Sequence, residues 1–146
     1  CRDIVRKVTE FKFLPIAGIY HKFFRALNGE SKMSKRDPLS MLTLNDSPEL
    51  IRKKIMSAVT GGRKTVEEQR KLGGIPEDSI VYELLLYHFM EDDRKVKKVY
   101  DDYRNGKMLD GEMKEIAIEI VTKFIADHQK KKRKMLPLAE KILKES

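Results

Sequence analysis

The chain has 146 residues, with 31 Lys or Arg against 23 Asp or Glu, which gives a formal net charge of +8 at pH 7. This length suits one domain of ordinary size, or one domain and a remnant of another. The single cysteine, Cys1, excludes an internal disulfide and any CxxC metal site. The apolar runs are far shorter than a membrane span and no signal peptide pattern is present, so we expect a cytoplasmic protein.

The basic charge is compatible with an anionic partner, for which RNA is the natural candidate. Because acidic residues are interspersed along the chain, the charge only slightly favours RNA binding over a domain with solvated basic helix faces. Composition alone therefore leaves the function open.

The first eight residues, from Cys1 on, carry an amphipathic helical pattern, as expected for the middle of a longer protein. Residues 19–24 are typical of a strand that runs into a loop, which places His21 close to the polar segment that follows. We expect His21, His88 and His128 to be packing or hydrogen-bonded histidines, with His21 the nearest to a candidate site. The sequence contains no Ser/His/Asp or Cys/His set from which a nucleophilic centre could be built.

A polar loop then holds two ammonium groups, a guanidinium and a hydroxyl within a few residues: Lys32, Met33, Ser34, Lys35 and Arg36. Such groups can neutralise the charge that develops when a nucleoside triphosphate loses pyrophosphate. The alternative is a basic loop that binds nothing.

Helices follow. Ser47 and Pro48 are a helix start, with Ser as N-cap and Pro in the first turn, and residues 61–62 (Gly-Gly) are expected to end that helix. Thr65 and Glu68 form a predicted capping box for a short helix that residues 73–74 (Gly-Gly) stop. No β alternation appears after about residue 43, and no internal repeat is present.

Asp78 or Ser79 can cap the next helix, whose residues 80–90 are apolar almost all round and should form the buried centre of a bundle. Two amphipathic helices follow, one that ends near residues 105–106 and a longer one that carries an apolar face from Met113 to Ile125. Pro137 is expected to break the longer helix, and a last short helix would hold residues 138–143.

Two charge clusters have plain interpretations. Residues 130–134, which are all Lys or Arg, could contact an RNA backbone or resemble a nuclear localisation signal. We favour a solvated basic helix end that the helix dipole stabilises. Residues 91–93 are better interpreted as a helix junction than as a metal-binding acid cluster.

Several stretches appear in a fixed order after the basic loop: residues 61–70, the glycines at 73–74, and residues 89–93, 106–114 and 127–129. With the KMSKS-like loop, they resemble the C-terminal half of the tryptophanyl-tRNA synthetase family of class I aminoacyl-tRNA synthetases. The resemblance is closer to the archaeal and eukaryotic branch than to the bacterial one. A tyrosyl enzyme is the near relative, and a free-standing helical RNA-binding module or a protein-interaction bundle are alternatives of other classes.

The resemblance implies a mainly α fold. Residues 1–45 would be the end of a Rossmann-type α/β catalytic domain with the signature loop, and residues 46–146 a helical anticodon-binding domain. The rest of the catalytic domain, with its HIGH signature and most of the tryptophan pocket, would lie outside this chain, and we find no HIGH-like tetrapeptide. The chain alone would then be inactive.

The full-length enzyme that the resemblance implies would activate tryptophan with ATP and Mg²⁺, then transfer it to tRNA-Trp. It would be a homodimer with no tightly bound cofactor and no protein metal site. Lys32, Ser34 and Lys35 would be catalytic, and Met33 and Arg36 would join them in binding ATP. Met33 is expected to be a packing anchor. Arg36 departs from the family's Ser, so a hydroxyl donor is replaced by a fork-shaped cation.

The resemblance also implies an anticodon pocket bordered by Arg63, Lys64, Asp110 and Lys114. Arg63 precedes an electropositive helix N-terminus and can make bidentate contacts to a base edge. Lys114 is expected in the first turn of a helix, where a cation is mildly unfavourable. Lys64 stands where an acid is common in the family, and Asp110 where some members have Thr. Helix capping is an equal alternative for Thr65 and Asp110.

Overall fold

The structure, a computed structural model, describes residues 7, 18–19 and 24–145. The predictions for Cys1 and His21, and nearly all of the opening helical pattern, concern residues outside these ranges. In the described part the chain is helical and contains no strand. Its elements are η1 (Pro38–Ser40), α2 (Pro48–Ser57), α3 (Val66–Leu72), η2 (Pro76–Asp78), α4 (Ile80–Leu84), the π-helix η3 (Leu85–Phe89), α5 (Asp93–Arg104) and α6 (Asp110–Glu145).

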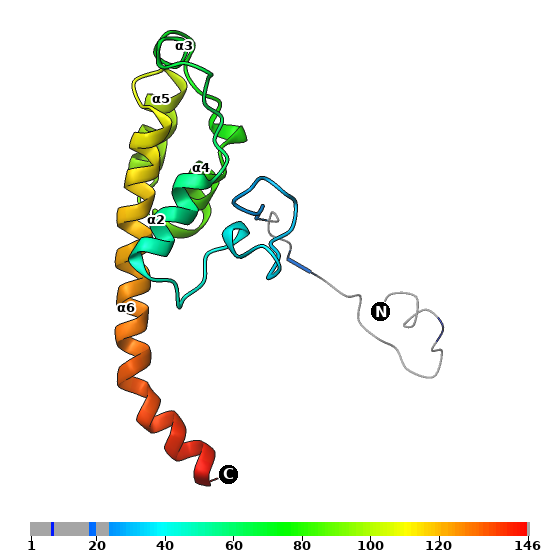
Figure 1. Cartoon of the computed structure of the whole chain (residues 1–146), viewed down its shortest axis with the longest axis vertical. Helices are drawn as coiled ribbons and strands as arrows, with labels where there is room; N and C mark the ends of the chain where they lie inside the picture. Colours follow the sequence, from blue (N-terminus) through cyan, green and yellow to red (C-terminus); the bar gives the residue numbers. More distant parts are fainter. Residues whose placement is uncertain (1–6, 8–17, 20–23, 146) are drawn as a thin grey trace.

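The long helix α6 organises the molecule. It runs along the length of the bundle, with α2 and α4 beside its first half and α3 beyond its N-terminal end (Figure 1). Its C-terminal part, in orange and red, extends past the other helices. The mainly α architecture predicted from the sequence is confirmed at this level, and the division near residue 45 remains a prediction.

Three helix starts are capped as the sequence predicts. The hydroxyls of Ser47, Thr65 and Ser79 each accept a hydrogen bond from the backbone N–H three residues further on, at 3.3, 3.2 and 3.1 Å. Of the predicted capping box, the bond from the Glu68 N–H to the Thr65 hydroxyl is the half that the structure contains. Helix α2 ends at Ser57, four residues before the glycines expected to stop it.

The glycines at 73–74 end α3 as predicted, and they do more than that. Gly73 has φ +71°, and a Cβ there would lie 1.7 Å from the carbonyl oxygen of Arg104. The N–H of Gly74 donates to the carbonyl of Tyr103 at 3.0 Å. Only glycine therefore allows the end of α3 to dock against the end of α5.

The core lies between α2, α4, α5 and α6. The prediction of an all-round buried central helix holds for α4 and the start of η3, but Leu86 is 37% exposed and Phe89 only partly buried. Leu86 and Tyr87 inside the π-helix are each 37% exposed, while Phe89 and Met90 at its end pack against the core. The core includes Leu27, Ile51, Ile55, Ile80, Val81, Tyr82, Leu84, Leu85, Tyr103, Met113, Val121 and Ile125.

The prediction that Pro137 breaks the last helix is wrong, because α6 continues through Pro137 to Glu145 and no separate last helix exists. Proline removes one N–H and so one hydrogen bond, and in an exposed segment water can satisfy the freed carbonyl. Figure 1 shows α6 changing direction in this part. Residues 130–134 therefore lie inside α6 and not at its end, so the predicted dipole effect does not apply to them.

Residues 24–46 pack onto the bundle through apolar side chains, such as Leu27 and Leu42, and through backbone hydrogen bonds. Ala26 and Leu27 are buried, and the N–H of Leu27 donates to Ser40 at 2.8 Å. The N–H of Val59 in turn donates to the carbonyl of Leu27 at 2.9 Å. The segment around the basic loop is thus part of the same hydrogen-bonded body as α2.

Candidate functional site

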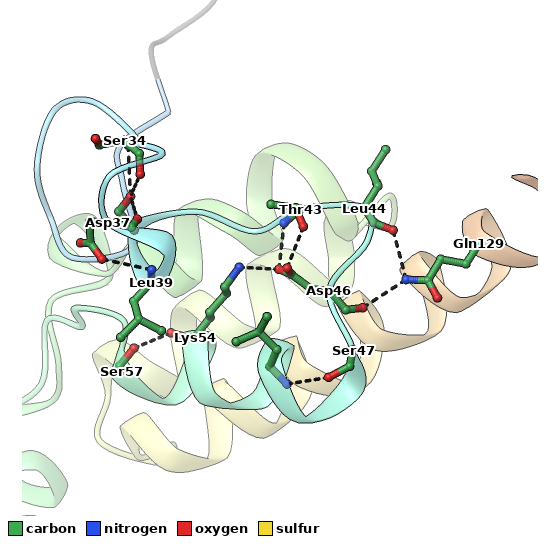
Figure 2. A network of polar contacts seen from close by, with 12 residues as sticks. Ser34, Asp37, Leu39, Thr43, Leu44, Asp46, Ser47, Lys54, Ser57 and Gln129 are labelled. Carbon is green, nitrogen blue, oxygen red and sulfur yellow. Dashed lines mark hydrogen bonds and ion pairs between the residues drawn. The ribbon is translucent and has the colours of Figure 1, made fainter.

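The basic loop, residues 28–38, is braced from inside by one buried hydroxyl (Figure 2). Ser40 Oγ accepts a hydrogen bond from the N–H of Ser34 at 3.1 Å and donates to the carbonyl of Asp37 at 2.7 Å. The Asp37 carboxylate accepts from the N–H of Leu39 and from the side-chain amide of Asn28, both at 3.1 Å. The backbone of the loop is therefore fixed without use of its cations.

The charged side chains of the loop face solvent. Lys32, Lys35 and Arg36 are exposed, and the Ser34 hydroxyl accepts a hydrogen bond from the N–H of Arg36 at 3.2 Å. Met33 instead lines a mostly apolar cavity of about 340 Å³, as expected for a packing anchor. The loop thus presents three cations on a held backbone, an arrangement that can neutralise the charge of an anionic group.

A second candidate place lies at the other end of the bundle. Arg63, Lys64 and Asp110 line a cavity of about 240 Å³ between the segment before α3 and the first turn of α6. We call this the Arg63 pocket. Three of the four residues predicted to border an anticodon pocket are thereby brought together.

Lys114 does not line this pocket and is engaged elsewhere. Its Nζ donates to the carbonyl of Met56 near the end of α2, at 2.7 Å. The sequence predicted Lys114 in the first turn of a helix. Because α6 begins at Asp110, Lys114 lies in the second turn, and this prediction is wrong. Burial lowers the pKa of Lys114, and the charge of Asp110 opposes this shift.

The Asp110 carboxylate accepts hydrogen bonds from two hydroxyl groups and does not cap α6, which was the alternative role expected for it. Its Oδ2 accepts a hydrogen bond from Thr60 Oγ1 at 2.9 Å, and its Oδ1 accepts a short hydrogen bond from Tyr103. Tyr103 is fully buried, and its pKa is raised first by burial and then by the Asp110 carboxylate. A Cβ at Gly62 would lie 2.0 Å from Asp110 Oδ2, so the backbone approaches the carboxylate as closely as glycine permits.

Arg63 is oriented by the neighbouring helix. Its backbone N–H donates to Gln69 Oε1 at 3.0 Å, and its Nε donates to the carbonyl of Gly73 at 2.9 Å. Gln69 is buried, with 3% of its surface exposed. The guanidinium plane is therefore fixed at the pocket rim, and the Nη pair, which these bonds do not use, is the part that can make a bidentate contact.

Sequence reasoning missed the residues that support this pocket. No local sequence pattern points to Thr60 or Gln69. Thr60 binds Asp110, which is distant in the chain, and Gln69 binds the backbone of Arg63 in the preceding loop. Tyr103 lies at a buried position of the amphipathic helix α5, so its place in the pattern does not show that its hydroxyl has a polar partner.

The acidic cluster at residues 91–93 and His88 have structural roles in the fold. Asp92 caps α5 by accepting from the N–H of Arg94 at 2.9 Å, which confirms the helix junction at residues 91–93. His88 packs edge-on against Phe24 with ring centroids 4.8 Å apart. Within residues 7, 18–19 and 24–145, no group of three or more His, Cys, Asp or Glu side chains could hold a metal ion. In the same residues no helix has both the length and the apolar character needed to cross a membrane.

The structure thus has two candidate sites on one helical bundle, the basic loop and the Arg63 pocket. Residues 1–126 match the family described as tRNA synthetases class I (W and Y), and the chain belongs to that family. Among curated relatives it is similar to tryptophan–tRNA ligases. It is 42% identical to that of Methanocaldococcus jannaschii over 97% of this chain and 38% of the relative, and 47% identical to that of Aeropyrum pernix over 87% and 34%.

Solved structures agree. The Aeropyrum pernix tryptophanyl-tRNA synthetase has a TM-score of 0.79 at 48% identity, over 84% of this chain and 33% of that one. The Giardia lamblia enzyme has a TM-score of 0.74 at 38% identity, over 77% of this chain and 28% of that one. A tyrosyl-tRNA synthetase from Archaeoglobus fulgidus, at 17% identity and a TM-score of 0.57, shares the fold alone. The resemblance to tryptophanyl-tRNA synthetases is confirmed, and the chain spans about a third of the length of these relatives.

Proposed function

We propose that this chain is the C-terminal third of a tryptophan–tRNA ligase. In the full-length enzyme, tryptophan reacts with ATP and Mg²⁺ to give the adenylate and pyrophosphate, and the aminoacyl group then passes to tRNA-Trp. The chain supplies the signature loop and the anticodon-reading surface. The support is the conjunction, in one helical body, of a braced KMSKS-like loop and the Arg63 pocket, together with the similarity to tryptophan enzymes.

Residues 1–45 would belong to the catalytic domain and residues 46–146 to the anticodon-binding domain. The enzyme would be a cytoplasmic homodimer that holds no cofactor tightly, and this chain alone would be inactive. The tyrosyl alternative is disfavoured, because similarity to the tyrosyl enzyme is at the level of the fold.

In the basic loop, Lys32 and Lys35 donate to phosphate oxygens as negative charge builds on the leaving pyrophosphate. The Ser34 hydroxyl accepts from the loop backbone and keeps its own proton for the nucleotide. Arg36, where the family has Ser, adds a planar cation that suits phosphate. The loop needs no general base, since the carboxylate of tryptophan is already the nucleophile.

In the Arg63 pocket, an anticodon base splayed out of its stack would meet the Arg63 guanidinium edge-on. Asp110, fixed by Thr60 and Tyr103, offers carboxylate oxygens that accept from a base amino group. Lys64 supplies a cation for the adjoining phosphate. Lys114 would act on the pocket through its charge and its contact with α2.

The first experiment is binding of the chain to a tRNA-Trp transcript, unchanged or with one anticodon base replaced, across a salt series. We expect the base change to cost about 1–3 kcal/mol, and Arg63→Ala to remove that difference. Arg52→Ala is the matched control, because Arg52 is an exposed arginine on α2 that pairs with Glu115 away from the pocket. Equal and steeply salt-dependent binding of both transcripts would show only a basic surface and would reject anticodon reading by these residues.

A further inference from the structure

The strap, residues 41–46, links the basic loop to α2 and is held by side chains from two helices (Figure 2). At its end, Asp46 Oδ2 accepts hydrogen bonds from the N–H of Thr43 at 2.9 Å and from Lys54 Nζ at 2.7 Å. Asp46 Oδ1 accepts from Thr43 Oγ1 at 2.7 Å. The Asp46 carboxylate thus joins the end of the strap to Thr43 and binds the strap to α2 through Lys54.

Both side chains of this ion pair are buried, whereas in the pair between Arg25 and Glu83 only the glutamate is buried and Arg25 is 32% exposed. The exposed fractions of the two side chains are 2% for Lys54 and 5% for Asp46. Burial would raise the pKa of Asp46, but hydrogen bonds from Lys54 and Thr43 outweigh it and hold the pKa below its ordinary value. A buried pair contributes little net stability compared with apolar side chains, and it restricts the strap to one arrangement.

Helix α6 holds the other side of the strap. Gln129 Nε2 donates to the carbonyls of Leu44 and Asp46, both at 3.1 Å, as Figure 2 shows. One turn further along, Lys132 Nζ donates to Asn45 Oδ1 at 3.0 Å. The strap therefore lies between α2, which it contacts through Lys54, and a part of α6 beyond the core.

The strap is continuous with the brace of the basic loop. Helix η1 ends at Ser40, and the residue after it, Met41, is already extended. The same Ser40 that holds Ser34 is anchored by the N–H of Leu27 at 2.8 Å. Displacement of Thr43 or Leu44 would be transmitted to Ser40 across only two or three residues, and from there to Ser34.

We propose that Asp46 and Gln129 are positioning residues for the basic loop, which hold the strap so that Lys32, Lys35 and Arg36 face the nucleotide. This proposal rests on the proposed function. Neither residue lies in the basic loop, and neither contacts the Arg63 pocket, which lies at the far end of α6. Their loss should therefore change how ATP is used and leave anticodon reading intact.

The test uses Gln129→Leu in the full-length enzyme, because Gln129 is only half-buried and leucine is tolerated in a helix. Tryptophan-dependent pyrophosphate exchange is measured against ATP concentration. We expect the KM for ATP to rise about three- to tenfold, from the loss of two hydrogen bonds, while the KM for tryptophan and the affinity for tRNA-Trp stay unchanged. An unchanged KM for ATP would overturn the proposal.

Arg52→Ala is the matched control. The Arg52–Glu115 ion pair also joins α2 to α6, but it is exposed and does not touch the strap. We expect this variant to keep the wild-type KM for ATP. An equal rise in both variants would mean that general docking of α2 on α6 matters and the strap does not, which would also overturn the proposal.

A second readout is independent of the reaction. Trypsin cleaves after Lys32, Lys35 and Arg36, and the rate of native-state cleavage reports how often the loop departs from its braced form. We expect cleavage in Gln129→Leu to be several-fold faster than in Arg52→Ala, and equal rates would count against the strap. A wild-type enzyme without tryptophan-dependent exchange would reject the proposed function, while the cleavage comparison would still decide whether the strap positions the loop.

The buried ion pair between Asp46 and Lys54 can be tested by replacing both residues at once. The double substitution Asp46→Leu with Lys54→Met removes both charges together, so that neither is left buried alone. We expect this variant to remain folded and to show a rise in the KM for ATP like that of Gln129→Leu. A folded double variant with a wild-type KM for ATP would remove Asp46 from the proposal.

Discussion

The basic loop and the Arg63 pocket both carry charged side chains, but they differ in which part of the chain is held in place. In the loop, the backbone is braced by Ser40 and Asp37 while the cations extend into solvent. In the pocket, the polar side chains themselves are held, since the Asp110 carboxylate is bound by Thr60 and Tyr103 and the Arg63 guanidinium by the carbonyl of Gly73. Under the proposed function, the loop would meet a flexible anionic substrate and the pocket a rigid base with fixed edges.

The difference makes a prediction about free energy. A cation of the loop can be removed without leaving any buried group unpaired, so its loss should change the reaction and not the stability. A polar group of the pocket has buried partners, so its loss should lower both stability and RNA affinity. Three variants of the loop and the pocket test this contrast, in order from the largest expected effect to the smallest, and a fourth variant outside both should have the smallest effect of all.

Lys35→Ala should have the largest effect on the reaction. In the full-length enzyme we expect adenylate formation to slow about a hundredfold, the scale for the loss of one preorganised electrostatic donor. Pre-steady-state pyrophosphate formation measures this rate, and thermal unfolding should be unchanged because Lys35 is exposed. Lys53→Ala, which removes an exposed cation of α2, is the control, and an unchanged rate in Lys35→Ala would move the role to Lys32.

Asp110→Ala should break the pocket and destabilise the fold together. It leaves the buried hydroxyl of Tyr103 without its acceptor, so we expect a loss of about 2 kcal/mol in the free energy of unfolding. Affinity for tRNA-Trp should fall about tenfold, by filter binding at fixed salt. Asp101→Ala, which removes an exposed partner of Lys97, should change neither quantity. Full stability in Asp110→Ala would contradict the contrast drawn above.

Tyr103→Phe removes only the hydroxyl and should cost less, about 1 kcal/mol of stability by denaturant unfolding at neutral pH. Because the pKa of Tyr103 is raised in the folded protein, the unfolded chain loses that proton first as the pH rises. The stability that depends on the protonated hydroxyl is complete below about pH 10 and declines above it. The advantage of the wild type over Tyr103→Phe should therefore shrink above that pH, and a constant difference would exclude the hydroxyl–carboxylate bond.

Substitution of Arg133 and Lys134 by Ala should have the smallest effect. These exposed residues lie within α6 and are far from the Arg63 pocket along the helix, so we expect affinity for tRNA-Trp to change less than about twofold. A decrease of about 1–2 in the slope of log affinity against log salt would instead show direct contact with the RNA backbone.

Local signals in the sequence predicted much of the fold. Ser47 with Pro48, Thr65 and Ser79 are capping residues whose partners lie within the next turn, so the pattern alone locates three helix starts. The end of α3 at the glycines was predictable for the same reason. The resemblance to a known family supplied the candidate residues, and the structure then showed which of them lie together.

What the sequence could not predict depends on partners that are distant along the chain. The bond between Thr60 and Asp110 spans 50 positions, and that between Gln129 and Leu44 spans 85. The passage of α6 through Pro137 was missed because proline is a strong helix breaker on average, while an exposed helix can bend and continue. The π-turn of η3 was missed because apolar periodicity does not distinguish it from a regular helix.

One consequence follows from the length of α6. Asp110 is its first residue and Gln129 lies nineteen residues later, so at 1.5 Å per residue the helix sets about 28 Å between them. Each residue also turns the helix by about 100°, so deletion of a single one would rotate Gln129 off the face that meets the strap. The number of residues in α6 between Asp110 and Gln129 therefore sets both the distance between the Arg63 pocket and the strap and the angle between the helix faces that meet them.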